Sequence, residues 1–496
     1  MMSSKLEEFA PIFRPRSHAV VGASSDITKF GGRFLRVLLT FGYPGKLYPV
    51  NPHESDILGL KTFPRVADIP ESVEFATITT PASTVPGIVE ECLAKGIKAV
   101  QILSSGFREL GPEGQRLEEQ IARMAVRGIR VIGPNCFGVY SPAGGLTILP
   151  GGELPKESGT VAFMSQSGGY AIRGANRASG LGIRFSQIVS YGNACDINEC
   201  DLLEYFYEDP KTKVILGYIE GPREGRRFFH LLREVCQSKP VIVWKGGLTK
   251  GGARAVASHT GSLAGEEMVW EGLSYQTGAI MVNSLDEMLD TALALLYLPT
   301  YRGRRLTVIG GGGGIGVAAA DTCERVGLSV PLFSLELQRK LTTMVPSVGT
   351  STRNPVDVGS PFPRPSVLRS VLETVLNEDG VDLAIISELF MSVASHMVRQ
   401  TDNSALNVRM DSAVAELAQV PVEVKKRLGK PLVMVLPVEA MAPEPEHIEA
   451  EEARRKVANH YLAEGIPVFL TLERAVKALA NIIGYYERRD AIASSG

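Results

Sequence analysis

Short apolar segments, each followed directly by a turn rich in Gly, Pro, Asn or Ser, alternate with helical patterns along the whole chain. Residues 17–39 give the first example, SHAVVGASSDITKFGGRFLRVLL, which reads as a strand, a small-residue turn and an amphipathic helix. This alternation is typical of parallel sheets covered by helices. The sequence therefore predicts an α/β protein with an N-terminal Rossmann-like domain, followed by two flavodoxin-like doubly wound domains.

The second and third domains are predicted from an internal repeat. GTVAFMSQSGGYAIRGA, from Gly159, and RLTVIGGGGGIGVAAAD, from Arg305, are each a strand, a Gly-rich turn and a helix of small residues. A strand that begins with Lys-Pro follows later in each copy, at Lys239 and at Lys430. Because single cores rarely exceed about 250–300 residues, the 496 residues are expected to form several domains. We predict boundaries that give domains at 1–145, 146–300 and 301–496.

Composition narrows the class of protein. The formal net charge of −2 shows no bias toward nucleic acid or anionic membranes. No apolar run approaches the roughly 18 residues of a membrane span, and the N-terminus lacks the apolar core of a signal peptide. The six cysteines are scattered and fit no common metal-binding spacing. These features predict a cytoplasmic protein with reduced cysteines, no metal site, and neither nucleic acid nor membrane as partner.

The first turn differs from a dinucleotide fingerprint. Gly22, Ala23 and Ser24 follow the first strand, but the G-x-G-x-x-G pattern is missing. The second strand, KLYPVNP, ends in Asn51, where NAD sites have a carboxylate for the ribose. With Lys46 just before that strand, the pattern favours a ligand with a ribose phosphate, such as coenzyme A. An ordinary tight turn between strand and helix is the alternative.

The stretch SQSGGYA predicts an anion site at the start of the second domain. Ser165, Gln166, Ser167, Gly168 and Gly169 lie where a strand passes into a helix, whose first N–H groups and dipole attract a phosphate. An ordinary capped helix is again the alternative.

His259 lies among small residues in RAVASHTGSLAG, residues 254–265, which predicts a movable loop that presents an imidazole. Glu220 ends the strand KVILGYIEG and is a candidate to keep one imidazole nitrogen protonated, so that the other acts as a nucleophile. A surface histidine and a solvent-facing glutamate are the simpler alternatives. The third domain has the charged helical stretch PEPEHIEAEEARRKVANHY in the equivalent place.

These motifs occur in one order: VVGAS, PVNP, TTPA, GPNCFGV, SQSGG, GNACD, YIEG, SHTGSLAG, NPVD and GIPVF. In that order and spacing the chain resembles, nearly end to end, the α subunit of NDP-forming acyl-CoA synthetases, which are relatives of succinyl-CoA synthetase. It is most similar to the ADP-forming acetate–CoA ligase type.

The resemblance implies a phosphoryl relay. Phosphate attacks an acyl-CoA, the acyl phosphate phosphorylates His259, and the phosphohistidine loop delivers the phosphoryl group to ADP. It further implies that Glu220 is the partner of the histidine and that Ser165–Gly169 hold phosphate. The implied CoA-binding positions are Gly22, Ala23, Ser24, Asn51, Pro52, Pro81, Asn135 and Cys136.

The resemblance also implies a second subunit. Three α/β units account for the 496 residues, so ADP or ATP and Mg are expected on an ATP-grasp β subunit, in an α2β2 heterotetramer. The third domain departs from the family in its Gly310–Gly316 turn, where Gly311 replaces an Asn and Ile315 a Pro. A non-catalytic protein that binds CoA or acyl-CoA is the alternative function; a CoA transferase with a glutamyl thioester finds no supporting motif.

Overall fold

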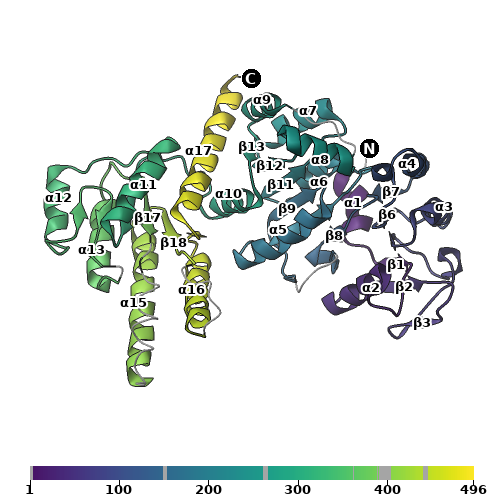
Figure 1. Cartoon of the computed structure of the whole chain (residues 1–496), viewed down its shortest axis with the longest axis horizontal. Helices are drawn as coiled ribbons and strands as arrows, with labels where there is room; N and C mark the ends of the chain where they lie inside the picture. Colours follow the sequence, from purple (N-terminus) through teal and green to yellow (C-terminus); the bar gives the residue numbers. More distant parts are fainter. Residues whose placement is uncertain are drawn as a thin grey trace. The chain divides into compact units, whose positions relative to one another are not determined.

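A computed structural model of the chain describes residues 4–148, 154–260, 266–360, 362–387, 389, 404–438 and 445–495 (Figure 1). The chain divides into two compact units, Met1–Ala292 with Arg488–Gly496, and Leu293–Glu487. The first unit contains two large sheets and a two-stranded one, and the second unit contains one large sheet. The doubly wound α/β fold predicted from the sequence is confirmed.

The first sheet has five parallel strands in the order β2-β1-β5-β6-β7. Its strands are β1 (Ser17–Val21), β2 (Lys46–Val50), β5 (Phe75–Ile78), β6 (Ala99–Ile102) and β7 (Arg130–Ile132). The helical segments are α1 (Lys5–Phe13), α2 (Phe30–Phe41), η1 (Val66–Asp68), η2 (Ala82–Thr84), α3 (Val85–Ala94), η3 (Arg108–Leu110) and α4 (Pro112–Ala125), and β3 (Asp56–Ile57) and β4 (Leu60–Lys61) form a hairpin. The direction of winding changes between β1 and β5, where open α/β sheets bind their ligands.

The second sheet has six strands in the order β13-β12-β11-β9-β10-β8. Its strands are β8 (Gly138–Tyr140), β9 (Val161–Ser165), β10 (Phe185–Ser190), β11 (Val214–Ile219), β12 (Val241–Lys245) and β13 (Ile280–Val282). The helices are η4 (Pro142–Gly144), α5 (Gly168–Gly180), α6 (Glu199–Glu208), α7 (Gly225–Val235), α8 (Lys250–Thr260), α9 (Glu267–Thr277) and α10 (Leu285–Tyr297). Apart from the antiparallel edge strand β8, this is the flavodoxin order, with its change of direction between β9 and β11.

The third sheet repeats this order in the second unit, as β15-β16-β14-β17-β18-β19. Its strands are β14 (Leu306–Gly310), β15 (Ser351–Thr352), β16 (Val356–Asp357), β17 (Leu383–Ser387), β18 (Leu432–Val435) and β19 (Val468–Phe469). The helices are α11 (Gly313–Arg325), α12 (Leu335–Thr342), α13 (Pro365–Leu376), α15 (Ser404–Leu428), α16 (Pro445–Ala463) and α17 (Leu472–Ser495). The repeat seen in the sequence is therefore a repeat of topology.

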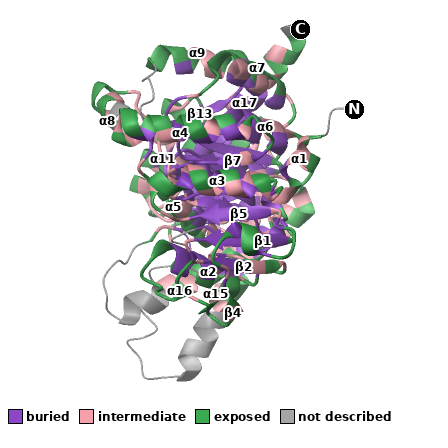
Figure 2. Ribbon diagram, turned by 90° about the vertical axis from the view of Figure 1, so that its right-hand side faces the viewer, coloured by how far each residue is buried: buried purple, intermediate pink, exposed green. Residues whose placement is uncertain are grey.

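The cores are made by the strands, whose apolar β-branched and aromatic residues suit a pleat buried on both faces. All five residues of β1, all six of β10 and all six of β11 are buried. In Figure 2 the strands β5 and β7 lie in the buried region, while α3 and α4 show exposed residues outside it. The carboxyl ends of the strands are thus left as the accessible places for polar chemistry.

Two features bear on the predicted domains and location. Strand β8 lies before residue 145 in the chain but pairs with β10 in the second sheet, and the boundaries at 145 and 300 stay predictions. Within the described ranges, no helix is long and apolar enough to cross a membrane.

Candidate functional site

The turn after β1 is built around two glycines. Gly22 has φ +85°, which favours glycine, and a Cβ on Gly31 would collide with the Gly22 carbonyl. Helix α2 therefore starts directly against the turn. Ala23 and Ser24 are buried beside it. The three predicted CoA residues of this turn lie together at the change of winding direction in the first sheet.

Asn51 reaches the same turn from the end of β2. Its Nδ2 donates to the Ala23 carbonyl at 2.8 Å and to Glu54 Oε1 at 3.2 Å, and its Oδ1 accepts from the His53 N–H at 2.8 Å. Pro52, next in the chain, is exposed.

The carboxylate of Glu54 also reaches this turn, from three residues beyond Asn51. It accepts from Ser24 Oγ at 3.1 Å and from the Ser25 N–H at 3.1 Å, and hydrogen bonds from Ser25 hold its pKa below the usual value. The strand end itself carries no carboxylate, as the sequence indicates, and Glu54 folds back to the turn from beyond it. Its carboxylate is engaged by the turn itself.

Lys46 does not join this group. It is the first residue of β2 and pairs with Ser17 at the opposite end of the sheet from Asn51. Its ammonium contacts the carboxylate of Glu71, which raises the pKa of Lys46. The first residue of a strand lies a full strand length from the carboxyl end, where the sheet binds its ligands. The geometry gives no support to the predicted role of Lys46.

The remaining CoA positions lie at the ends of β5 and β7. Pro81 caps η2, and Asn135 has φ +57° after the cis Gly133–Pro134 bond. Cys136 is buried, contacts the Ile102 carbonyl through Sγ at 3.2 Å, and has its pKa raised to about 12 by burial. Such a thiol is protonated at neutral pH and unreactive, so Cys136 supports the turn by packing.

The predicted phosphate turn forms as a helix start. Ser167 is the N-cap of α5, and its Oγ accepts from the Tyr170 N–H at 3.4 Å, while Ser165 Oγ donates to the Ser167 carbonyl at 2.7 Å. A Cβ on Gly169 would meet only Ser167 Oγ, at 3.8 Å. The backbone at the first turn of α5 is thus open to a close-approaching anion.

Gln166 and Gly168 make structural contacts that could not be predicted from the motif. Gln166 Oε1 accepts from the N–H groups of Glu220 and Gly221, the second at 3.0 Å, which ties the turn after β9 to the turn after β11. A Cβ on Gly168 would lie 2.5 Å from the ring of Phe137. Phe137 follows Cys136, so the last predicted CoA turn packs on the predicted phosphate turn.

Glu220 lies at the end of β11, adjacent to the phosphate turn across the change of winding direction. It is 5% exposed, and Tyr218 Oη donates to its Oε1 at 3.3 Å. A solvent-facing glutamate is therefore excluded. A buried carboxylate at this edge is suited to orienting a proton donor.

Lys245 is a neighbour of Glu220 that the sequence reasoning missed. It ends β12, is 4% exposed, and its Nζ lies 5.5 Å from the centroid of the Trp270 ring. Burial lowers the pKa of Lys245, opposed by the charge of Glu220. The signal that could have found it is its position: it ends a buried strand next to the one that ends in Glu220.

The structure corrects the predicted loop around His259. Helix α8 runs to Thr260, so the backbone of His259 is in its last turn, and residues 261–265 and the His259 side chain lie outside the described residues. Ala253, Ala255 and Ala257 favour helix here over the loop that the small residues suggested. Helix α8 packs against η3 of the first sheet's domain.

A buried polar network, also missed, joins η3 to the second sheet. Glu118 is 1% exposed, and its carboxylate pairs with Arg108 at 2.5 Å and accepts from Asn193 Nδ2 at 2.9 Å. Asn193 also donates to Glu109 at 2.7 Å. Removal of one member would leave a buried charge unpaired, which is costly. The network fixes the two strand-end edges of the first unit relative to each other.

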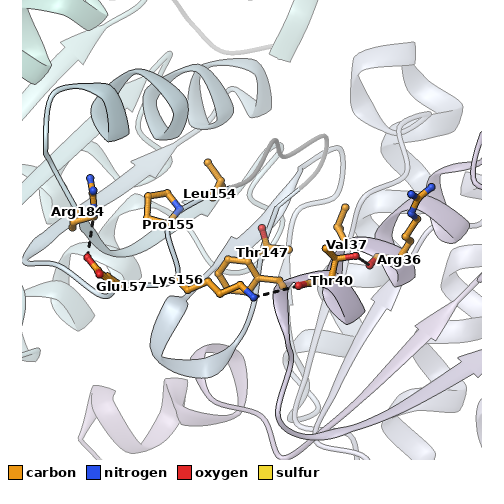
Figure 3. A pocket seen from close by; sticks show the side chains of 10 residues that line it. Arg36, Val37, Thr40, Thr147, Leu154, Pro155, Lys156, Glu157 and Arg184 are labelled. Atoms are coloured by element: carbon orange, nitrogen blue, oxygen red, sulfur yellow. Dashed lines mark hydrogen bonds and ion pairs between the residues drawn. The ribbon is translucent and has the colours of Figure 1, made fainter. Parts of the chain in front are cut away.

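Two further pockets contain none of the predicted site residues. The larger, about 870 Å³, lies between α2 and residues 154–157; there Lys156 donates to the Thr40 carbonyl at 3.3 Å and Arg184 pairs with Glu157 at 3.8 Å (Figure 3). In the second unit, about 390 Å³ opens at the Gly310–Gly316 turn against Pro355 and Asp357. Within the part of the chain that the structure describes, no group of three or more His, Cys, Asp or Glu residues could hold a metal ion.

Two family models match this chain. A CoA-binding domain covers residues 16–142, and the flavodoxin-like domain of succinyl-CoA ligase covers residues 158–295. These matches coincide with the first and second sheets, and with them the fold defines a chain of the succinyl-CoA ligase type.

Similarity to individual proteins is more specific. The α subunit of ADP-forming acetate–CoA ligase I from Pyrococcus furiosus is 37% identical, over 95% of this chain and 96% of its own length. ADP-forming acetate–CoA ligase I from Archaeoglobus fulgidus is 37% identical over 75% of this chain, which spans about half (54%) of that longer relative. The structure of acetyl-coenzyme A synthetase 1 from Candidatus Korarchaeum cryptofilum, solved with phosphate and ADP, matches with a TM-score of 0.79 and 33% identity over 98% of both chains. The chain belongs to the family of ADP-forming acetate–CoA ligases.

Proposed function

We propose that this chain is the CoA-binding and phosphoryl-carrying subunit of an ADP-forming acyl-CoA synthetase. It would interconvert acyl-CoA, ADP and phosphate with a carboxylic acid, CoA and ATP. The observation that supports this most is the edge of the second sheet, where the open start of α5 and buried Glu220 flank the change of winding direction. Membership of the ligase family supports the same reaction class.

The chemistry has three balanced steps. A phosphate oxygen attacks the acyl carbon, the C–S bond breaks, and CoA leaves as the thiolate and takes a proton. An imidazole nitrogen of His259 then attacks the phosphorus of the acyl phosphate, and the P–O bond to the acyl group breaks to release the carboxylate. Finally an ADP oxygen attacks the phosphohistidine, and the P–N bond breaks to give ATP.

The residues fit separate roles in this scheme. The first N–H groups of α5, at Gly168 and Gly169, would hold phosphate, with Ser165, Gln166 and Ser167 shaping the turn. Glu220 would keep the distal nitrogen of His259 protonated and stabilise the imidazolium that forms. The turns at Gly22, Asn51, Pro81 and Asn135 would hold CoA.

Nucleotide and Mg are assigned to an ATP-grasp β subunit, in an α2β2 assembly in the cytoplasm. The name of one relative supports a second polypeptide: the Pyrococcus protein, matched over 95% of this chain and 96% of its own length, is an α subunit, a name that implies a β subunit. A CoA-binding protein without turnover is the alternative, and it would show no transfer to His259.

We expect the chain to bind CoA and not NADH. The first turn lacks the dinucleotide pattern, and the carboxylate of Glu54, which reaches the turn from beyond β2, is engaged by Ser24 and Ser25. Calorimetric titration with CoA and with NADH measures this. Saturable NADH binding with no heat from CoA would overturn the assignment of the first domain.

We also expect turnover to require a second chain. The three large sheets are of the doubly wound type, and the Pyrococcus relative is named an α subunit, so we expect the purified chain with acyl-CoA, phosphate, ADP and Mg to make no ATP. Activity should appear when the chain is co-expressed with an ATP-grasp chain from its host. Steady ATP formation by the chain alone would contradict the division of labour.

A further inference from the structure

A cavity of about 430 Å³ in the first unit is lined by Lys245, the neighbour of Glu220. It opens between the ends of α7 and α9 and the carboxyl end of β12, and its walls are mainly apolar. The lining side chains that matter here are Phe228, Phe229, Trp270 and Leu273, with Lys245 as the cation. None of the positions predicted from the sequence lines this cavity.

The ammonium of Lys245 is suited to binding an anion in this cavity. Lys245 is 4% exposed, and its ammonium, which has three N–H donors, donates to the carbonyl of Gly246. Its ammonium also lies over the Trp270 ring. A buried ammonium is stabilised by anions that offset its desolvation. Glu220 supplies one such charge, and on the side of the apolar cavity a carboxylate with an apolar chain would supply another.

The volume points to the size of that anion. A two-carbon acid has four heavy atoms, comparable to four waters, or roughly 120 Å³ at about 30 Å³ each. The cavity is several times larger, and its wall includes Phe228 and Trp270, whose rings contact each other at 6.3 Å between centroids. A monocarboxylic acid with a bulky apolar or aromatic chain fits this shape and polarity.

We propose that this cavity binds the carboxylic acid of the reaction, with Lys245 paired to the carboxylate and Trp270 and Phe229 against its chain. The inference rests on the proposed function, in which a carboxylate is released when His259 takes the phosphoryl group. Lys245 would stabilise that leaving group beside Glu220, and the aromatic walls would set which acids are accepted.

Trp270 offers a direct measurement, because the chain has two tryptophans. The other, Trp244, packs against Tyr170 and Tyr218 at 4.6 and 4.9 Å between ring centroids. In the full-length Trp244→Phe variant, the emission of Trp270 alone is followed during titration with 3-phenylpropanoate, acetate and the uncharged 3-phenylpropanamide. Saturable changes are expected with 3-phenylpropanoate, with binding about 10- to 100-fold weaker for the amide, as for loss of a charge-assisted hydrogen bond.

Lys245→Met in the same background should weaken 3-phenylpropanoate binding by the same factor and abolish the preference for acid over amide. The matched control is Lys239→Met: Lys239 stands just before the opposite end of β12 and donates to the carbonyls of Phe206, Tyr207 and Asp209. It should leave the preference intact.

Equal binding of acid and amide by the parent, or an unchanged preference in Lys245→Met, would overturn the proposal and leave Lys245 as a counter-ion of Glu220. If Lys245→Met does not fold, the comparison of 3-phenylpropanoate with 3-phenylpropanamide in the parent still tests whether the cavity binds a carboxylate. CoA binding and His259 labelling are measured without this ligand, so a failure here is separate from a failure of the proposed function.

Discussion

Replacement of His259 by Ala should abolish phosphoryl transfer and ATP formation while CoA binding is nearly unchanged. In the proposed relay every phosphoryl group passes through this imidazole, so no slower route remains inside the site. The CoA turns belong to the first sheet and to different strand ends, which is why ligand affinity should survive. Activity of the two-chain enzyme and calorimetry with CoA measure the two effects.

The control for this variant is His230→Ala. His230 lies on α7 and its ring contacts that of Phe229 at 5.5 Å between centroids, so the change removes an imidazole from the same domain. It should leave phosphoryl transfer within about twofold, as is usual for surface substitutions. Activity that persists in His259→Ala would assign the relay to another nucleophile.

Glu220→Gln should slow phosphorylation by about three to four powers of ten without removing the phosphoryl-accepting site. The amide keeps the size of the side chain and a hydrogen-bonding contact to Tyr218, but it loses the charge that holds the tautomer and stabilises the imidazolium. Single-turnover labelling, in which chemistry is followed directly, measures the rate.

Glu224→Gln is the matched carboxylate control for that experiment. Glu224 lies four residues further on, at the start of α7, and pairs with Arg227 at 3.0 Å. Its effect should stay within a few-fold. A Glu220→Gln rate close to that of the parent would show that the carboxylate orients nothing in the reaction.

Much of the architecture could be predicted because each strand of a parallel α/β protein, and the turn that follows it, can be recognised from a short stretch of sequence. Buried strands such as β9 and β11 read as short apolar runs, and the turn that follows each one carries the polar residues. That rule placed Ser165–Gly169 and Glu220 at strand ends. Which strand ends are neighbours depends on strand order, and the flavodoxin order brings these two together.

What could not be predicted depends on side chains that reach across space. Glu54 folds back to Ser24 from beyond the strand end, and Phe137 fills the space that Gly168 leaves. Lys245 becomes a candidate binding residue only because it is buried against Trp270, a contact that the sequence does not show. Lys46 was predicted to bind the ligand because it is close to Asn51 in the sequence. It lies at the other end of β2, and therefore at the opposite edge of the sheet.

The helix at α8 shows a further limit. Small residues were taken as a sign of a loop, but alanines favour a helix whereas glycines oppose it, and in residues 253–260 alanines outnumber glycines. A histidine in the last turn of a short helix next to a Gly-containing segment is still compatible with local unwinding. The prediction about its chemistry is therefore independent of the corrected secondary structure.

The most direct test is to locate the phosphoryl group. The chain, with its partner chain present, is incubated with acyl-CoA and ³²P-labelled phosphate, quenched in base and digested, and the labelled peptide is identified. The account predicts an acid-labile, base-stable label on His259 that is absent without acyl-CoA and absent from His259→Ala. A label on a carboxylate, or an undiminished label in His259→Ala, would contradict the phosphohistidine relay.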